Sequence, residues 1–404
     1  MNNIKVVGII AEYNPFHNGH LYQIEQIRKQ IPNCCIIVIM SGDFVQRGSA
    51  AILNKWNRAD IATSAGVDLV LELPFAYACR SAEYFSKGAV QILNATNIVD
   101  YIAFGAETSD ISKIFNIAEY FLEPNNILSV KSNMKEGLSY PKALQNSLPN
   151  KSLQDVISTP NNILAIEYVK QLFVLNSNIK PFLIKRNNSN HNDQNWVGNI
   201  ASATAIRKNI YTFGVTDSLS EVLPTETLTI LQKAMSEKAI ITDNERLSLL
   251  ILHKLMDSTP SYLRQHTDVS EGLEYKIIKM AEQHNSFHDL VSSVVNKRYT
   301  YNRIARILIQ TLIGLPQNTD PNYIKILSFN QNGQMLLKKI KAKSNLHIIN
   351  KIGRDFANIP NSVNKCMLST DIKASNIYQM LLPNNTRVHN IDFYRSPSFN
   401  KVNI

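Results

Sequence analysis

Long apolar runs and paired cysteines are both missing from this sequence. No apolar stretch reaches the roughly 18–20 residues that a membrane-spanning helix needs. The opening segment MNNIKVVGIIAEYNP lacks the pattern of a signal peptide. The cysteines, Cys34, Cys35, Cys79 and Cys366, show no CxxC spacing, which argues against a zinc site or a disulfide framework. We therefore expect a cytoplasmic protein with reduced thiols, no dedicated metal site and no membrane partner, and we infer no protein partner.

Acidic residues are scarce in the second half of the chain. Residues 1–200 carry 17 Lys and Arg against 16 Asp and Glu, whereas residues 201–404 carry 25 against 16. From Lys297 onward there are 16 basic residues and 4 acidic ones. A basic segment beside a neutral one is typical of a polyanion-binding module attached to a neutral domain, although such a surface can also serve solubility alone.

The first 190 residues alternate between short apolar runs and amphipathic stretches. The apolar runs are rich in Val, Ile and Leu on both faces, as in the strands of a covered parallel sheet. We place strands at Lys5–Ala11, Cys35–Met40, Asp68–Leu73, Val99–Gly105 and Pro181–Lys185. We place helices at Leu21–Gln30, Lys55–Ala65, Ser81–Leu93, Ser109–Phe121 and Asn162–Val174. This order predicts a doubly wound α/β fold, in which ligands bind outside the carboxyl ends of the strands.

Helical periodicity dominates the second half, as in ETLTILQKAM and NERLSLLILHKLM. We divide the chain into a Rossmann-like α/β domain over residues 1–215 and a mainly α-helical, basic domain over residues 216–404. Two short apolar runs, YIKILSFN and NLHIIN, predict strands near the end of the second domain.

Two histidines lie where the first predicted strand gives way to a helix. His17 and His20 are three residues apart, so they share one face of the helix N-terminus. The N–H groups and the helix dipole at that end favour anions, and Gly19 lets a phosphate approach the backbone. Two donors aimed at one phosphate would stabilise the charge that builds up at a phosphorus under attack. Helix capping alone is the alternative, whereas a metal pair is more often spaced four residues apart with an adjacent acid.

The sequence resembles a known family. HNGH at residues 17–20 is similar to the HxGH motif of nucleotidylyltransferases, and SATAIR at residues 202–207 is similar to their ISSTxxR signature. A longer series of segments occurs in the order seen in bacterial tRNA(Met) cytidine acetate ligases. These segments are AEYNPFHNGHL, MSGDFVQRG, AGVDLVLELP, FGAE, PNNILAIEYVK, IKR, ASATAIR, KRYTYNRIARILI and YIKILSFNQNGQ. The resemblance covers nearly the whole chain.

The resemblance implies an ATP-dependent ligase. Members of the family form acetyl-adenylate from acetate and ATP, which Mg²⁺ should accompany, and then acetylate N4 of the wobble cytidine of elongator tRNA(Met). It implies that His17, His20 and Arg207 carry the catalysis. The ATP-binding residues that it implies are Ile10, Ala11, Glu12, Tyr13, Asn14, Pro15, Phe16, His17, Asn18, Gly19, His20, Leu21, Gly105, Asn162, Arg186, Thr204 and Arg207.

Basic and aromatic residues alternate near residue 300, where Tyr299 and Tyr301 lie among cations. That composition suits an RNA backbone and unstacked bases, although a solvated basic helix is the alternative. The predicted tRNA-binding residues are Lys297, Arg298, Arg303 and Arg306. The segment KKIKAK at residues 338–343 is a further candidate for backbone contacts.

Other residues near the predicted strand ends are candidates for anion contacts. Gln46 and Arg47, in a glycine-flanked loop, are placed to orient a carboxylate or the tRNA, or else lie in a solvated loop. We predict that Lys55 reaches a phosphate and that Trp56 packs in the core. The chain departs from the family at Asp43, where Asn or His is usual. It also departs after Arg186, where NNSNHND replaces a glycine-rich GAGYHD loop and keeps the residues His191 and Asp193.

Two other functions fit parts of the sequence. An adenylyltransferase acting on a small phosphorylated metabolite, such as a pantetheine phosphate or nicotinate mononucleotide, would use the HNGH motif but would not need a basic second half. A non-catalytic RNA-binding protein would use the basic half but would not need the intact motif. Acetate-dependent exchange between ATP and pyrophosphate separates the three classes.

Overall fold

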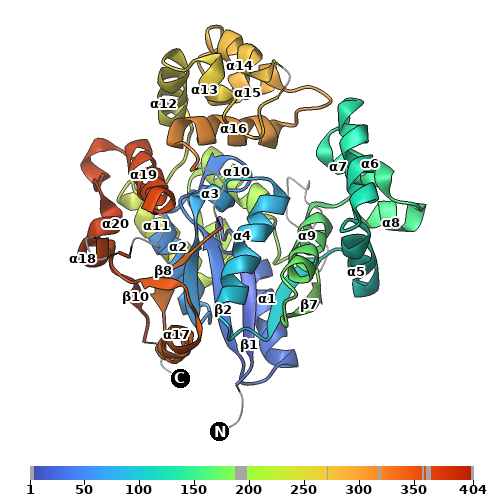
Figure 1. Ribbon diagram of the computed structural model, residues 1–404. Coiled ribbons are helices and arrows are strands. Elements are labelled where there is room, and N and C mark those ends of the chain that lie inside the picture. The colour runs from blue at the N-terminus through green and yellow to red at the C-terminus, as the bar shows by residue number, and fades with distance from the viewer. Residues whose placement is uncertain are drawn as a thin grey trace.

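A computed structural model describes residues 4–186, 198–270, 272–316, 320–356, 359–360 and 365–401 (Figure 1). Its core is an eight-stranded sheet in the order β10-β8-β5-β2-β1-β6-β7, with β9 pairing with β8. The strands are β1 (Val6–Ala11), β2 (Cys35–Ser41), β5 (Leu69–Leu73), β6 (Tyr101–Ala106), β7 (Lys180–Lys185), β8 (Tyr323–Phe329), β9 (His347–Ile349) and β10 (Ser398–Phe399). A small hairpin is formed by β3 (Phe44–Val45) and β4 (Ser49–Ala50).

The five strands β5, β2, β1, β6 and β7 run parallel, which confirms the predicted α/β fold. Every residue of β2 is buried, because helices cover both faces of the sheet. The chain moves outward from β1 through β2 to β5 and then returns to the other side of β1 with β6. This reversal creates a crevice at the carboxyl ends of β1 and β6, where ligands bind in such sheets.

Helices pack on both faces of the sheet. The apolar sides of α4 (Ala82–Ala95), α9 (Pro160–Val174) and α17 (Gln331–Lys343) share one core with one face of the sheet. The other face packs against α1 (Asn18–Gln30), α2 (Lys55–Ser64), α10 (Ala203–Phe213) and α11 (Thr225–Ser236). The predicted helices of the first half are therefore all present, including α5 (Ile111–Tyr120).

Two groups of helices extend away from the sheet, one at its side and one beyond its carboxyl edge (Figure 1). We call the first the arm; it comprises α5, α6 (Pro124–Lys135), α7 (Tyr140–Ser147) and α8 (Lys151–Val156). We call the second the helical module; it comprises α12 (Glu245–Met256), α13 (Pro260–Leu263), α14 (Leu273–Ala281), α15 (Phe287–Val294) and α16 (Tyr301–Ile313). The helical module has its own apolar core, which α19 (Lys365–Leu381) completes.

The last described part of the chain returns to the sheet. Strand β8 pairs antiparallel with β5, and β9 and β10 pair with β8. The short helices α3 (Phe75–Ala78), α18 (Ile352–Asp355) and α20 (Ile391–Tyr394) complete the described α-helices. The division of the chain between residues 215 and 216 remains a proposal. Strands β8 to β10 belong to the second segment but extend the sheet of the first one, so the two segments share this sheet.

The basic helix α17 lies at the opposite end of the molecule from α16 (Figure 1). Its lysines therefore do not lie beside the predicted RNA-binding residues around Tyr301, and their contact with an RNA backbone stays a prediction. In the described part of the chain, no helix combines the length and apolar character needed to cross a membrane.

Candidate active site

A cavity of about 1280 Å³ opens at the carboxyl ends of β1 and β6. Its floor includes Gly105 at the end of β6 and His20 after β1, and its walls include Tyr140 of the arm and Arg306 of the helical module. The cavity thus lies at the point where the strand order of the sheet reverses, and both the arm and the helical module contribute to its walls. This position matches the crevice that the α/β topology predicts.

His17 and His20 form a stacked pair at the N-terminus of α1. The ring centroids are 3.8 Å apart, with the ring planes 24° from parallel. Nδ1 of His17 accepts a hydrogen bond from the Gly19 N–H at 3.1 Å, and Nδ1 of His20 accepts one from the His17 N–H at 3.2 Å. Since both Nδ1 atoms are acceptors, each neutral ring carries its hydrogen on Nε2. The predicted capping role and the predicted anion-binding role therefore use different nitrogens of the same rings.

His20 is held neutral by its surroundings. Burial lowers the pKa of its imidazole well below the usual value, and His17 and Arg186 lower it further. Tyr13 and Phe16 pack against the ring at centroid distances of 4.8 and 5.4 Å. A neutral imidazole in this position presents a fixed Nε2–H donor rather than a mobile charge.

Two glycines leave room for side chains that line the cavity. A Cβ atom at Gly19 would lie 2.9 Å from Cε1 of His17, so a larger residue would displace the imidazole. A Cβ atom at Gly105 would lie 3.1 Å from Cγ of Arg186. Burial lowers the pKa of the Arg186 guanidinium, and Glu107 opposes this effect. Both glycines therefore preserve the placement of a hydrogen-bond donor.

Arg207 and Arg47 lie beside one another at the start of α10. Oγ1 of Thr204 accepts hydrogen bonds from both guanidinium groups, from Arg47 at 3.0 Å and from Arg207 at 3.3 Å. Arg207 also donates to the Asn14 carbonyl at 2.7 Å, which ties α10 to the segment after β1. Burial lowers the pKa of Arg207, and the neighbouring charge of Arg47 lowers it further. Two guanidinium groups held together in this way form a binding site for an anion with several oxygens.

Arg58 of α2 positions the loops around the cavity, a role that the sequence did not reveal. Its side chain is fully buried and donates to the carbonyls of Leu53 at 3.0 Å, Glu12 at 2.5 Å and Gly42. Oε1 of Glu12 in turn accepts a hydrogen bond from the Gln46 N–H at 2.9 Å. An arginine on the inward face of an amphipathic helix was the signal that could have indicated this role.

The sequence model of the HIGH Nucleotidyl Transferase family matches residues 4–391. The chain belongs to this family. It is 40% identical over 400 residues to the tRNA(Met) cytidine acetate ligase of Thermoanaerobacter sp. (strain X514), which covers 96% of this chain and 98% of that one. It is 39% identical over 417 residues to the tRNA(Met) cytidine acetate ligase of Acetivibrio thermocellus, covering 99% and 97%. Within the HIGH nucleotidyl transferases, the chain therefore groups with the tRNA(Met) cytidine acetate ligases.

A solved structure has the same fold over nearly the whole chain. The crystal structure of Thermotoga maritima TmcAL bound with alpha-thio ATP superposes with a TM-score of 0.91 at 30% identity, covering 99% of this chain and 100% of that one. The same protein without a ligand gives a TM-score of 0.92. The recognised family and fold are thus confirmed at the level of sequence and of structure.

Most of the nucleotide-binding residues expected of this HIGH nucleotidyl transferase line the cavity. They are Ile10, Ala11, Glu12, Tyr13, Asn14, His17, Gly19, His20, Gly105, Arg186, Thr204 and Arg207. Five expected residues are not among those that line it: Pro15, Phe16, Asn18, Leu21 and Asn162. The first four belong to the turn that leads into α1 or to α1 itself.

Asn162 orders a loop instead of facing the cavity. Its side chain is only 3% exposed. Oδ1 accepts hydrogen bonds from the N–H groups of Glu107 at 3.0 Å and Thr108 at 3.3 Å, and Nδ2 donates to the Val156 carbonyl at 2.8 Å. The neighbouring Asn161 lines the cavity and donates to Oε1 of Glu107 at 2.5 Å. These contacts make Asn162 a positioning residue for the loop after β6.

The predicted tRNA-binding residues are divided by the fold. Arg298, Arg303 and Arg306 line the cavity, and Lys297 is exposed outside it. The prediction that Tyr299 offers a stacking surface is wrong, because the ring is 6% exposed and packs in the core of the helical module. Arg303 covers this ring, with its guanidinium carbon 4.9 Å from the centroid.

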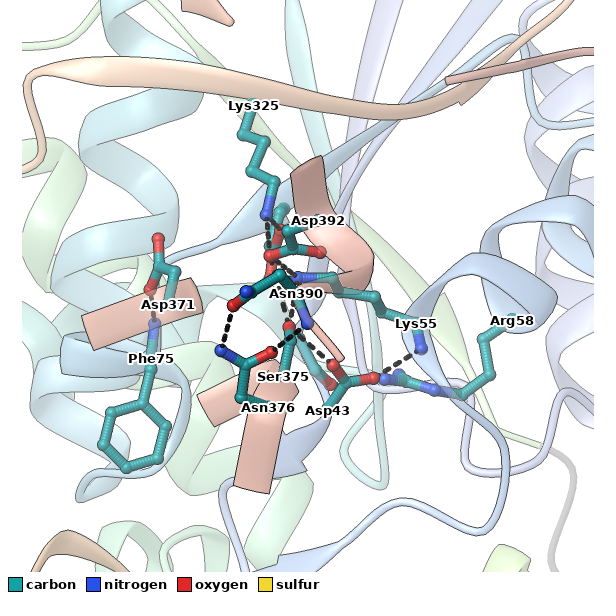
Figure 2. A network of polar contacts seen from close by, with 12 residues as sticks. Asp43, Lys55, Arg58, Phe75, Lys325, Asp371, Ser375, Asn376, Asn390 and Asp392 are labelled. Atoms are coloured by element: carbon teal, nitrogen blue, oxygen red, sulfur yellow. Dashed lines mark hydrogen bonds and ion pairs between the residues drawn. The ribbon is translucent and has the colours of Figure 1, made fainter. Parts of the chain in front are cut away.

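The prediction that Lys55 reaches a phosphate is also wrong. Its ammonium group is fully buried and contacts Oε1 of Glu72 and Oδ2 of Asp392, both at 2.8 Å. Lys325 contacts the same two carboxylates at 2.8 and 2.7 Å, and Figure 2 shows Lys325 approaching Asp392 from β8. We call Lys55, Glu72, Lys325 and Asp392 the ionic cluster. Burial alone would lower the pKa of Lys55, but the Asp392 and Glu72 carboxylates raise it well above its usual value.

Asp43 belongs to the surroundings of the ionic cluster. Its Oδ1 accepts a hydrogen bond from the Lys55 N–H at 2.7 Å, and its Oδ2 accepts one from Oγ of Ser375 at 2.9 Å (Figure 2). Asp43, at which the chain departs from the family, is therefore a buried residue that supports the loop carrying Gln46. Trp56, which we predicted to pack, is buried. The altered segment with His191 and Asp193 lies outside the described residues.

Among the residues that the structure describes, no group of three or more His, Cys, Asp or Glu side chains is arranged to hold a metal ion. The donors around the cavity are instead imidazole and guanidinium groups, which suit phosphate oxygens. A divalent ion at this site would therefore depend on oxygen atoms of the nucleotide.

Proposed function

We propose that the chain forms acetyl-adenylate from acetate and ATP and transfers the acetyl group to N4 of the wobble cytidine of elongator tRNA(Met). The observation that carries this proposal is the His17–His20 pair, whose Nδ1 atoms are both engaged by the backbone at the strand-order reversal. The names of the relatives and the ATP analogue bound to the Thermotoga maritima protein support the same reaction.

In the first half-reaction, an acetate oxygen attacks the α-phosphorus of ATP. The bond from that phosphorus to the bridging oxygen breaks, and pyrophosphate leaves with the electron pair. His17 and His20 donate from Nε2 to the α-phosphate oxygens, where negative charge increases in the transition state. Arg207 and Arg47, which Thr204 holds together, bind the departing phosphates.

Mg²⁺ accompanies the nucleotide in this proposal. It would be held mainly by phosphate oxygens and water, as is usual where the protein provides no carboxylate cage, and it would neutralise phosphate charge. The chain's own contribution is to orient the triphosphate with fixed N–H donors.

In the second half-reaction, the N4 amine attacks the acetyl carbonyl carbon. The bond between that carbon and the phosphate oxygen breaks, AMP leaves, and N4 loses one proton. Arg298 and Arg303, which line the cavity on the side of the helical module, contact the RNA backbone near the reacting nucleotide.

The test is the exchange of labelled pyrophosphate into ATP, measured with and without acetate, followed by mass analysis of tRNA after incubation with acetate and ATP. Exchange that requires acetate, together with a mass gain of one acetyl group on the tRNA, is the expected result. The variant His20→Ala should lower the exchange rate by about 10²–10³-fold, because it removes one donor to the transition state. His253→Ala, an exposed histidine on α12, is the matched control and should have no effect.

Exchange driven by another metabolite and not by acetate would contradict the proposal. So would acetate-dependent exchange that persists at the wild-type rate in His20→Ala, because the reaction would then take place elsewhere.

A further inference from the structure

Buried polar atoms without partners gather on one wall of the cavity. Oδ2 of Asp268 and Nε of Arg306 are both buried, and neither makes a hydrogen bond within the described residues. Both residues line the cavity, at the side formed by the helical module. Native proteins leave few buried polar atoms unsatisfied, so an acceptor and a donor left together at a cavity wall point to a ligand with the complementary pattern.

The remaining atoms of these residues hold them in place. The Asp268 carbonyl accepts hydrogen bonds from Nε and Nη2 of Arg303 at 3.2 and 2.8 Å. Nη1 of Arg306 donates to the Gln46 carbonyl at 3.4 Å. Helix α16 also fits closely against the loop between β3 and β4, because a Cβ atom at Gly48 would lie 2.4 Å from the backbone nitrogen of Arg306. The unpartnered acceptor and donor are therefore held by a fixed backbone.

Arg80 adds to the rigidity of the same wall. It is only 3% exposed, its Nη2 donates to Oγ1 of Thr267 at 2.8 Å, and its guanidinium stacks on the ring of Tyr84 at 3.9 Å. Thr267 and Tyr84 both line the cavity. Its Nε is likewise buried without a partner.

The charges on this wall favour a nucleobase over a phosphate. Burial lowers the pKa of Arg306, and the Asp268 carboxylate opposes this effect, which shows that the two charges influence one another. A carboxylate beside a guanidinium repels a phosphate oxygen but accepts an amino hydrogen. The purely cationic groups Arg298 and Arg303 on the same side are better suited to the RNA backbone.

We propose that Asp268 and Arg306 recognise the base-pairing edge of the target cytosine. Oδ2 of Asp268 accepts a hydrogen from the N4 amine, and Nε–H of Arg306 donates to N3 of the base. Carboxylates are suitable acceptors for this amine, and unpaired bases are read along this edge. Uracil presents an oxygen in place of the amine and an N–H in place of N3, so it opposes both contacts.

This proposal rests on the proposed transfer to a tRNA cytidine, and the experiment separates the two. The dissociation constants of two tRNA(Met) transcripts, one with cytidine and one with uridine at the wobble position, are measured for wild type, Asp268→Asn, Arg306→Lys and Glu282→Gln. Glu282 is an exposed acid of the helical module and serves as the matched control. Because both transcripts are measured on the same preparation, a partly unfolded sample does not change their ratio.

Wild type and Glu282→Gln should bind the cytidine transcript about tenfold or more tightly than the uridine transcript. Asp268→Asn should bring this ratio close to one, since an amide can turn either its oxygen or its nitrogen toward the base, and Arg306→Lys should reduce it. A wild-type ratio of one, or a ratio preserved in both variants, would overturn the proposal. Absence of acetate-dependent exchange in wild type would instead overturn the proposed function.

Discussion

The ionic cluster and the cavity use charged side chains in opposite ways. In the ionic cluster, Lys55 and Lys325 each contact both Glu72 and Asp392 within 2.8 Å. At the cavity, Arg47, Arg186 and Arg207 have no carboxylate within 4.0 Å in the described part of the chain. Paired charges join distant segments of the fold, whereas under the proposed function the charges of the cavity are available to the anionic groups of a substrate.

This difference has an energetic cost at the cavity. Burial lowers the pKa of Arg186 and Arg207, which means that their charged forms are less favourable there than in water. Under the proposed function, a bound triphosphate would supply the missing partners, so part of its binding free energy would offset a cost that the folded protein already carries. Groups with perturbed pKa values are typical of functional sites.

The largest expected effect comes from breaking the ionic cluster. Lys55→Met leaves two buried carboxylates with one cation fewer, so we expect the free energy of unfolding to fall by about 3–5 kcal/mol. Urea denaturation of the full chain measures this change. Lys151→Met is the control, because the Lys151–Asp155 pair is exposed and should contribute about 0.5 kcal/mol or less. Equal losses of unfolding free energy in the two variants would show that the buried ionic cluster contributes no more to stability than an exposed ion pair.

A smaller effect is expected at the paired guanidinium groups. Arg207→Gln should weaken ATP binding by about 10–100-fold, since a hydrogen bond to a charged group contributes about 1.5–3 kcal/mol. The stability of the unliganded protein should change little, because the lost hydrogen bond to the Asn14 carbonyl is offset by the removal of a half-buried cation that has no ion-pair partner among the described residues. Isothermal titration with a non-hydrolysable ATP analogue and urea denaturation report these two quantities separately. Arg395→Gln, which changes an exposed arginine after α20, is the control. If Arg207→Gln lowers the stability but not the affinity for ATP, Arg207 has a structural role like that of the ionic cluster.

The smallest expected effect concerns a buried imidazole that lacks a charged partner at hydrogen-bond distance. Burial lowers the pKa of His266 to about 4. The unfolded chain therefore binds a proton more readily than the folded chain, so the free energy of unfolding falls as the pH drops below the unfolded value of about 6.5, and this decrease levels off below the folded value of about 4. At about pH 5 the expected loss is about 2 kcal/mol relative to neutral pH. His266→Gln should reduce the pH dependence of urea denaturation by that amount, and an unchanged dependence would show that His266 does not resist protonation.

The α/β fold could be predicted because its central strands β2 and β5 are buried throughout. An apolar run such as Cys35–Ser41 needs no distant partner to be recognised, and the HNGH motif directly follows one such run. The resemblance to the family then supplied Arg186 and Arg207. Both residues line the same cavity as the histidines.

The ionic cluster could not be predicted, because its members are far apart in the sequence. Nothing near Lys55 indicates that Asp392 will neutralise it, so a cation at the start of a helix was interpreted as a phosphate ligand. Asn162 presents the same difficulty, since its amide contacts Glu107 rather than the cavity. A side chain's role in such cases depends on which segments the fold brings together, and sequence spacing does not contain that information.

The insertion of β8 beside β5 has a consequence for the order of events during synthesis. Strands β1 to β7 are complete once residue 185 has been made, but the edge of β5 stays open until residues 323–329 leave the ribosome. Until then the growing chain presents an apolar strand with unpaired backbone groups, a known template for wrong pairing. During this interval Glu72, at the β5 edge, also lacks its ion-pair partner Lys325. Premature termination before β8 should therefore yield aggregates rather than a smaller working enzyme.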